Sequence, residues 1–248
     1  LLHRIINQTR IILNLFLDGC RARRARGWVL PGLVLAVAAL LAGCASPPRP
    51  PDPPPQPPAA PRVAKLGLAL GGGAARGFAH VGVIQVLEEA GIRPDFVAGT
   101  SAGSLVAALY ASGKSGAQLQ AVALEMDEAA FADWTLPLFN RGMLRGEALG
   151  RYVNAQVGHK LIENMAVPLG VVATDLASGQ GVLFRRGDTG TAVRASSAVP
   201  ALFVPVKIGS QDYVDGGLVS PVPVRYARQM GADVVLAVDI SSAPEGNP

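Results

Sequence analysis

The stretch DFVAGTSAGSLVAALY, residues 95–110, is the most informative part of the chain about its fold. It joins a short apolar run to a helix-length apolar run through a glycine-rich turn, and such strand-to-helix units are the building blocks of α/β proteins. Short apolar runs keep alternating with amphipathic segments from Val63 onward. We therefore predict one α/β domain over residues 63–248, with a mostly parallel central sheet.

The apolar periodicity places the expected elements within this domain. Strands are expected at 65–70, 96–98, 169–173, 181–184, 211–214 and 234–238. Helices are expected at 77–90, 102–112, 115–126, 145–157, 191–196 and 222–230.

Gly99-x-Ser101-x-Gly103 has the spacing of a nucleophile elbow, with the predicted strand before it and the predicted helix after it. In such an elbow the two glycines allow a strained turn and close contact with neighbouring strands. Ser101 would then lie at the positive end of a helix dipole, where a developing oxyanion is stabilised. The competing interpretation is a serine that merely caps a helix after a glycine-rich turn.

A second glycine-rich turn, GGGAARG at residues 71–77, also joins a predicted strand to a predicted helix. Its spacing fits neither the G-x-G-x-x-G dinucleotide fingerprint nor a P-loop, which needs a Lys followed by Ser or Thr. Unobstructed amides at a helix start bind anions, which favours an oxyanion hole for acyl transfer. The residues expected to form it are Gly71, Gly72, Gly73, Arg76 and Gly77. For Arg76 two roles stay open, holding the loop and attracting a phosphate.

The general base is expected to be Asp215, which ends a predicted strand and precedes Gly216 and Gly217. These glycines let another backbone approach the carboxylate closely. A Ser-acid-His triad in α/β-hydrolase order is absent, since neither His80 nor His159 follows a suitable acid. An ordinary aspartate in a β-turn is the alternative for Asp215. A triad that uses His80 remains a rival.

Residues 1–43 have the layout of a secretory signal peptide, with an arginine-rich segment, a short apolar run and small residues before Cys44. Leu41-Ala-Gly-Cys44 resembles the lipobox of bacterial lipoproteins, in which the cysteine is lipidated; the alternative is a cleaved signal with a free thiol. The proline-rich residues 44–62 are expected to form an extended spacer. These features predict a lipid-anchored protein of the bacterial cell envelope, facing the periplasm.

Charge and cysteine content exclude two other classes of function for the domain. Residues 1–43 hold six arginines and one aspartate, a net charge of +5, so the remaining residues carry −1 of the total of +4. The domain therefore has no overall basic charge, and we do not expect it to bind nucleic acid. Both cysteines, Cys20 and Cys44, precede the domain, which excludes a cysteine nucleophile or a cysteine-ligated zinc within it.

Four blocks, in order, resemble the patatin-like phospholipase family, and most closely its bacterial members related to neuropathy target esterase. They are LGLALGGGAARGFAHVGVI at 66–84, GTSAG at 99–103, RASSAVPALF at 194–203 and VDGGLVSPVPV at 214–224. The resemblance implies a three-layer α/β/α fold, a Ser101–Asp215 dyad, no metal or cofactor, and hydrolysis of lipid acyl esters. Ala74 stands where some members have another glycine.

Two other functions remain open from sequence: an envelope scaffold that has lost activity, and a transacylase that passes the acyl group to an alcohol. The acyl pocket is expected to draw on the apolar residues of 115–144. A lid, a lipid-docking surface and a packed cap are the open roles for the large apolar residues of this stretch, Phe131, Trp134, Leu136, Leu138, Phe139 and Met143.

Overall fold

The structure is a computed structural model that describes residues 62–126 and 142–241. The expected signal peptide, Cys44 and nearly all of the proline-rich spacer lie outside these ranges, as do Phe131, Trp134, Leu136, Leu138 and Phe139.

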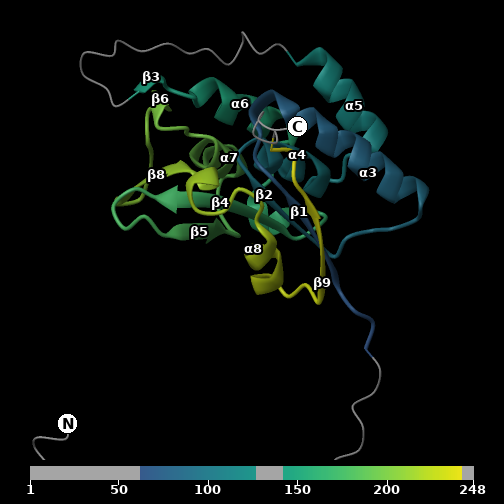
Figure 1. The fold of residues 1–248 in the computed structure, drawn as a ribbon. Helices are drawn as coiled ribbons and strands as arrows, with labels where there is room; N and C mark the ends of the chain where they lie inside the picture. The colour runs from purple at the N-terminus through teal and green to yellow at the C-terminus, as the bar shows by residue number, and fades with distance from the viewer. Residues whose placement is uncertain (1–61, 127–141, 242–248) are drawn as a thin grey trace, which may run out of the picture. The chain divides into compact units, whose positions relative to one another are not determined.

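The central sheet combines a parallel part with an antiparallel part (Figure 1). Its main path runs β7-β8-β4-β2-β1-β9, and β5 pairs with β4. Strands β9, β1, β2 and β4 are parallel, whereas β5, β8 and β7 are attached through antiparallel pairs. The strands are β1 (Leu66–Leu70), β2 (Phe96–Thr100), β4 (Leu169–Asp175), β5 (Gly181–Phe184), β7 (Val206–Ile208), β8 (Gln211–Asp215) and β9 (Val234–Val238).

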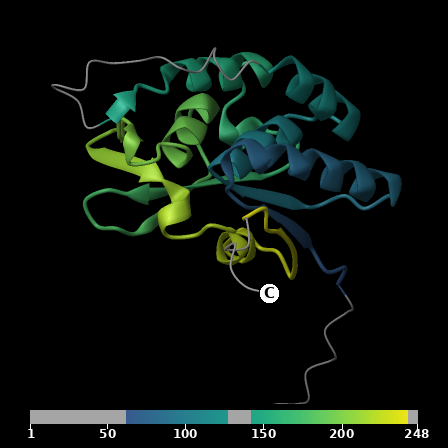
Figure 2. The same cartoon turned by 45° about the horizontal axis from the view of Figure 1, so that its top comes forward.

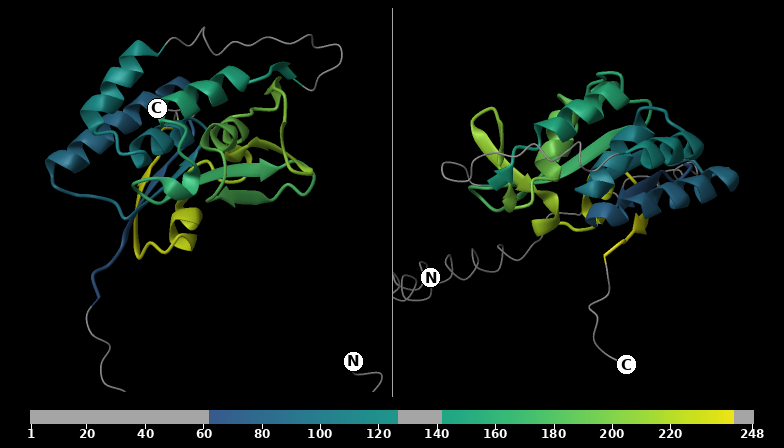
Figure 3. Two further views of the ribbon diagram at one scale, coloured as in Figure 1. Left: turned by 180° about the vertical axis from the view of Figure 1, so that it is seen from behind. Right: turned by 90° about the horizontal axis from the view of Figure 1, so that it is seen from above.

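Helices cover both faces of this sheet, which confirms the expected three-layer α/β/α fold (Figure 2). One face carries α3 (Ala79–Glu89), α4 (Ala102–Ala111), α5 (Gly116–Glu125), α6 (Glu147–Gln156) and α7 (Thr189–Ser196). The other face carries α8 (Val224–Gln229), as the view from behind in Figure 3 also shows.

The two faces follow from the alternation of side chains along each strand. In β1, Leu68 and Leu70 belong to the larger core, beneath α3 to α7. Ala69, between them, faces the smaller core, where Ala227 and Met230 at α8 pack. The central strands read as continuous apolar runs because both of their faces are buried.

Short elements were missing from the expectations. They are the two-stranded sheet of β3 (Gly142–Leu144) and β6 (Ala201–Phe203), strand β7, and three 3-10 helices: η2 (Ala74–Phe78), η4 (Ile162–Asn164) and η5 (Gly216–Leu218). Segments of three to five residues contain too few repeats to give a clear periodic signal. The helix expected from residue 77 is in fact η2 followed by α3. Among the described residues, no helix is long and apolar enough to span a membrane.

Candidate active site

Ser101 occupies a strained turn between β2 and α4. Its backbone has φ 52° and ψ −125°, a conformation that costs a non-glycine residue free energy and is typical of functional turns. Gly103 is required because a Cβ there would lie 2.2 Å from the carbonyl oxygen of Leu70. A Cβ on Gly99 would lie 2.4 Å from the carbonyl oxygen of Gly103. The turn therefore has the geometry expected of the elbow.

The hydroxyl of Ser101 donates a hydrogen bond of 2.7 Å to Oδ2 of Asp215. The other carboxylate oxygen, Oδ1, accepts a hydrogen bond of 2.6 Å from the amide of Gly217. Asp215 is only 7% exposed. The carboxylate is thus held from one side by a backbone amide and presents its other oxygen to the serine.

Strand β4 explains why two residues so far apart in sequence meet. On β4, Val172 pairs with Thr100 of β2, and the next residue, Ala173, pairs with Asp215 of β8. Both β4 residues pair with β5 on their other side, so β2 and β8 share one edge of β4. Ser101, which follows β2, and Asp215, which ends β8, therefore lie next to each other.

Gly216 permits this close approach. A Cβ at Gly216 would lie 2.1 Å from the carbonyl oxygen of Val172, which no side chain can occupy. The two glycines after Asp215 thus have distinct roles, since Gly216 allows the chain to pass β4 and Gly217 donates its amide to the carboxylate.

Burial raises the pKa of the Asp215 carboxyl above its ordinary value. The hydrogen bonds from the Ser101 hydroxyl and the Gly217 amide act in the opposite direction without cancelling this shift. A raised pKa makes the carboxylate a better proton acceptor, as a general base requires.

Two further side chains hold the pair in place, and sequence reasoning did not find them. Ser196 accepts a hydrogen bond of 2.8 Å from the amide of Ser101 and donates one of 2.5 Å to the carbonyl of Val172. Thr174 donates a 2.8 Å hydrogen bond to the carbonyl of Asp215. Ser196 lies in the RASSAVPALF block, the one signal that pointed to this region.

The glycine-rich loop lies against the nucleophile, but its amides differ from expectation. A Cβ on Gly72 would lie 3.2 Å from the Cβ of Ser101. The amide of Gly71 donates to the carbonyl of Val238 at 3.0 Å, and that of Gly72 donates to Pro221 at 2.9 Å. The N–H groups of Gly71 and Gly72 therefore already have backbone acceptors, which disfavours these two amides as the predicted oxyanion donors.

Within the described residues, the amides of Gly73 and Ala74 have no such acceptor. Ala74 also lines the cavity that contains Ser101. Its φ of 50° is a left-handed value that suits glycine better, in keeping with the glycine that some patatin-like sequences carry at this position.

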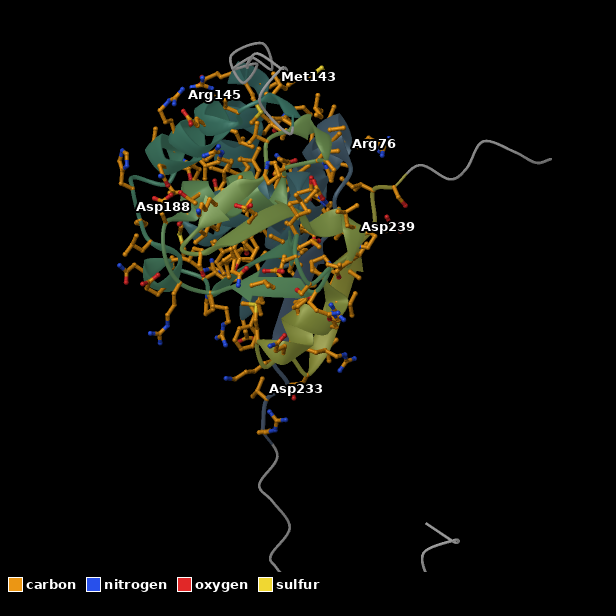
Figure 4. The ribbon with its side chains drawn as sticks, turned by 90° about the vertical axis from the view of Figure 1, so that its left-hand side faces the viewer. Arg76, Met143, Arg145, Asp188, Asp233 and Asp239 are labelled. Atoms are coloured by element: carbon orange, nitrogen blue, oxygen red, sulfur yellow. The ribbon has the colours of Figure 1, made fainter. Side chains whose placement is uncertain are left out.

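Arg76 and Gly77 have structural contacts. Nε of Arg76 donates a 2.8 Å hydrogen bond to the carbonyl of Ile240, which ties the loop to the segment after β9. Figure 4 shows Arg76 on the same side of the domain as Asp239. A Cβ on Gly77 would lie 3.0 Å from that of Ala102, so Gly77 lets η2 pack closely on the start of α4.

His80 contacts the glycine-rich loop rather than the serine. Its Nε2 donates a 2.7 Å hydrogen bond to the carbonyl of Gly71, and the residue is fully buried. Burial lowers the pKa of His80 below its ordinary value, against the opposing effect of that hydrogen bond. Since the Ser101 hydroxyl donates to Asp215, this geometry disfavours the His80 triad. His159 lies on the surface, in a turn with φ 56°.

An apolar cavity of about 410 Å³ begins at Ser101. Of the expected stretch 115–144, the lining includes Leu119, Val122, Ala123 and Met126, but not Met143. The remaining lining comes from Ser101, η2, α3, α4, α6, β6 and the segment that leads into β6. The described residues contain no cluster of three or more His, Cys, Asp or Glu side chains suited to a metal ion.

Comparison with known proteins gives concordant results. The family model described as "Patatin-like phospholipase" matches residues 68–228. An uncharacterized NTE family protein of Mycobacterium tuberculosis is 35% identical over 195 residues, covering 73% of this chain and 51% of the relative. Patatin-like phospholipase domain-containing protein 6 of Mus musculus is 34% identical over 188 residues, covering 73% of this chain and 14% of that protein.

Among solved structures, VipD from Legionella pneumophila is similar in fold, with a TM-score of 0.52 and 16% identity. The match covers 62% of this chain and 46% of VipD. The chain spans about half the length of the mycobacterial relative.

Proposed function

The chain belongs to the patatin-like phospholipase family, and from this premise we propose that it hydrolyses lipid acyl esters with Ser101 as nucleophile and Asp215 as general base. The observation that carries the proposal is the 2.7 Å hydrogen bond from the serine hydroxyl to a buried carboxylate. A direct contact of this kind lets the carboxylate take the hydroxyl proton without an intervening histidine.

In the first half of the reaction, Asp215 accepts the proton of Ser101 as Oγ attacks the ester carbonyl carbon. The carbonyl oxygen becomes an oxyanion, to which the amides of Gly73 and Ala74 in the glycine-rich loop can donate hydrogen bonds. The tetrahedral intermediate then collapses, the bond to the alcohol oxygen breaks, and the leaving alcohol takes the proton from Asp215. An acyl-serine remains.

In the second half, water attacks the acyl-serine and gives a proton to Asp215. Collapse of the second tetrahedral intermediate releases the fatty acid and returns the proton to Oγ of Ser101. Asp215 thus acts as base and acid in turn, and the cycle uses no other titratable side chain.

Labelling with a fluorophosphonate ester probe tests this assignment. We expect the parent to be labelled and Ser101→Ala to be unlabelled. Asp215→Asn keeps the shape but not the base, so its labelling rate should fall by about 10²- to 10⁴-fold. Ser210→Ala changes an exposed serine in the turn between β7 and β8, and it should label like the parent.

Hydrolysis of a short-chain ester by the same four proteins completes the test. Loss of labelling and hydrolysis together in Ser101→Ala supports the proposal. Parent protein that is folded yet neither labelled nor active would instead indicate a scaffold. Labelling with transfer to added alcohols in preference to water would indicate a transacylase.

We also propose that Cys44 carries a lipid anchor that places this domain at a bacterial membrane. The proposal rests on the sequence alone, through Leu41-Ala-Gly-Cys44 and the apolar run before it. Acyl chains stabilise membrane attachment by about 0.8 kcal/mol per buried methylene group, so several chains on one residue suffice for a stable anchor.

A further inference from the structure

Two helices present matching apolar stripes to the cavity at Ser101. On each helix, the lining residues are spaced by three and four positions, which places them on one face. The stripe on α4 is Ala102, Leu105, Val106 and Leu109, and the stripe on α5 is Leu119, Val122, Ala123 and Met126. The cavity is therefore a slot that runs along one face of α4 and one face of α5, and η2, α3, α6 and the residues at β6 complete its lining.

The slot has one end at Ser101 and its opposite end at Leu109 and Leu119. Helix α5 follows α4 after a connection of four residues, 112–115, and runs back over it (Figure 1). Met126, after the end of α5, thus lies toward the Ser101 end of α4. Leu109 and Leu119 lie at the opposite end, where they are 3% and 2% exposed. At 1.5 Å per helical residue, Leu109 is about 12 Å along α4 from Ser101.

Polar contacts with α3 hold the start of α5. The amide of Gly116 donates to Glu88 at 2.8 Å, and Nε2 of Gln85 donates to Oε1 of Gln120 at 2.8 Å. A capping box between Ser115 and Gln118 fixes the first turn of the helix. These contacts fix the start of α5 against α3, and Leu119 packs in the same core cluster as Leu109 of α4.

The chemistry of the slot suits an unbranched hydrocarbon chain. Ser101 and Ser197 are the polar side chains among the described residues that line it, and none of these residues is charged. Its volume of about 410 Å³ lies toward the low end of small-molecule pockets, which span roughly 300–1,000 Å³.

We propose that this slot binds a single acyl chain lengthwise, with the ester carbonyl at Ser101, and that Leu109 and Leu119 close its far end and set the preferred chain length. The inference rests on the proposed function, because it places the acyl group of that reaction. To that function it adds that the protein encloses one acyl chain of the substrate and that Leu109 and Leu119 determine which chain length fits.

The test compares kcat/KM for p-nitrophenyl esters of butanoate, octanoate, dodecanoate and hexadecanoate. Val122→Trp fills the middle of the slot, and Leu119→Ala enlarges its closed end. Leu124→Trp is the matched control, since Leu124 is on the same helix but is 80% exposed and outside the lining.

We expect Val122→Trp to lower the ratio of long-chain to butanoate kcat/KM by at least tenfold, since one methylene in a pocket changes this constant by about 10- to 200-fold. Leu119→Ala should move the preferred ester to a longer chain. Leu124→Trp should leave the chain-length profile unchanged.

The profiles separate failure of this inference from failure of the proposed function. Parent activity with the same profile in Val122→Trp and Leu119→Ala would overturn the slot while leaving Ser101 and Asp215 in place. Parent protein that hydrolyses none of the esters and takes no fluorophosphonate would contradict the proposed function itself. If Val122→Trp misfolds and is not labelled, Leu119→Ala alone tests the slot. A preferred ester of longer chain in Leu119→Ala then supports the slot, and an unchanged preference overturns it.

Discussion

Asp215 faces opposing demands, because it is buried among protein groups and must be ionised to accept a proton. Burial raises its pKa in the folded state. A carboxyl with a raised folded pKa contributes stability that is fully present below the unfolded pKa and is lost as pH rises through the folded pKa. At neutral pH the ionised carboxylate therefore costs the fold some of its free energy of unfolding.

Asp215→Asn should accordingly raise the melting temperature at neutral pH while abolishing most of the hydrolysis. The gain should shrink as pH is lowered toward the ordinary range of aspartate, where the parent carboxyl is protonated as well. Thermal unfolding monitored by circular dichroism across this pH range measures the difference. A variant that is less stable than the parent at every pH would show that the carboxylate stabilises the fold.

The pH dependence of catalysis follows from the same shift. As general base, Asp215 acts only when ionised, so hydrolysis should rise with pH through its folded pKa, above the ordinary range of aspartate. A profile of kcat/KM against pH, with a short ester, measures this rise. A rate that stays flat from the ordinary aspartate range to neutral pH would contradict the role of Asp215 as base.

At the scale of elements, the site depends on how closely α4 approaches β1. A Cβ on Gly103 would lie 2.2 Å from the carbonyl oxygen of Leu70, which belongs to the backbone of β1 and cannot move aside cheaply. Helix α3 offers a contrast, because Gly82 is exposed and a Cβ there would meet nothing within 4 Å.

Gly103→Ala and Gly82→Ala should therefore change stability in opposite directions. In α3, alanine should raise the free energy of unfolding by up to about 1 kcal/mol, the usual difference in helix propensity. At Gly103 the added methyl group should lower it by about 1–3 kcal/mol or more through overpacking. Urea unfolding of both variants provides the measurement, and equal effects would contradict the close approach of α4 and β1.

For the whole molecule, the remaining question is how the domain reaches its substrate. Cys44→Ala should remove the lipid attachment site while leaving the described domain unchanged. Expressed in a bacterium, the parent should incorporate labelled fatty acid and sediment with membranes, and the variant should do neither. Fluorophosphonate labelling of the variant should persist. Membrane association that survives the substitution without fatty-acid incorporation would argue against the anchor.

The fold class and most elements followed from sequence because their signals are local. The strands at 181–184 and 234–238 and the start of α4 at residue 102 were predicted as they occur. Strand β7 in the antiparallel part of the central sheet and strand β6 in the separate two-stranded sheet were not predicted, since they have three residues each. Pairing partners are also not encoded in periodicity, so the mixed character of the sheet appeared only in the structure.

The sequence by itself determined which residues were candidates for chemistry: a serine between glycines at a strand-to-helix turn, an aspartate before two glycines, and a glycine-rich loop at a helix start. Only the tertiary structure decided that β4 brings Ser101 and Asp215 into contact and that Ser196 holds the turn. It also showed that the amides of Gly71 and Gly72 donate hydrogen bonds to the carbonyls of Val238 and Pro221. The physical reason is that a turn follows from neighbouring residues, whereas the partner of a hydrogen bond depends on chain segments that meet only after folding.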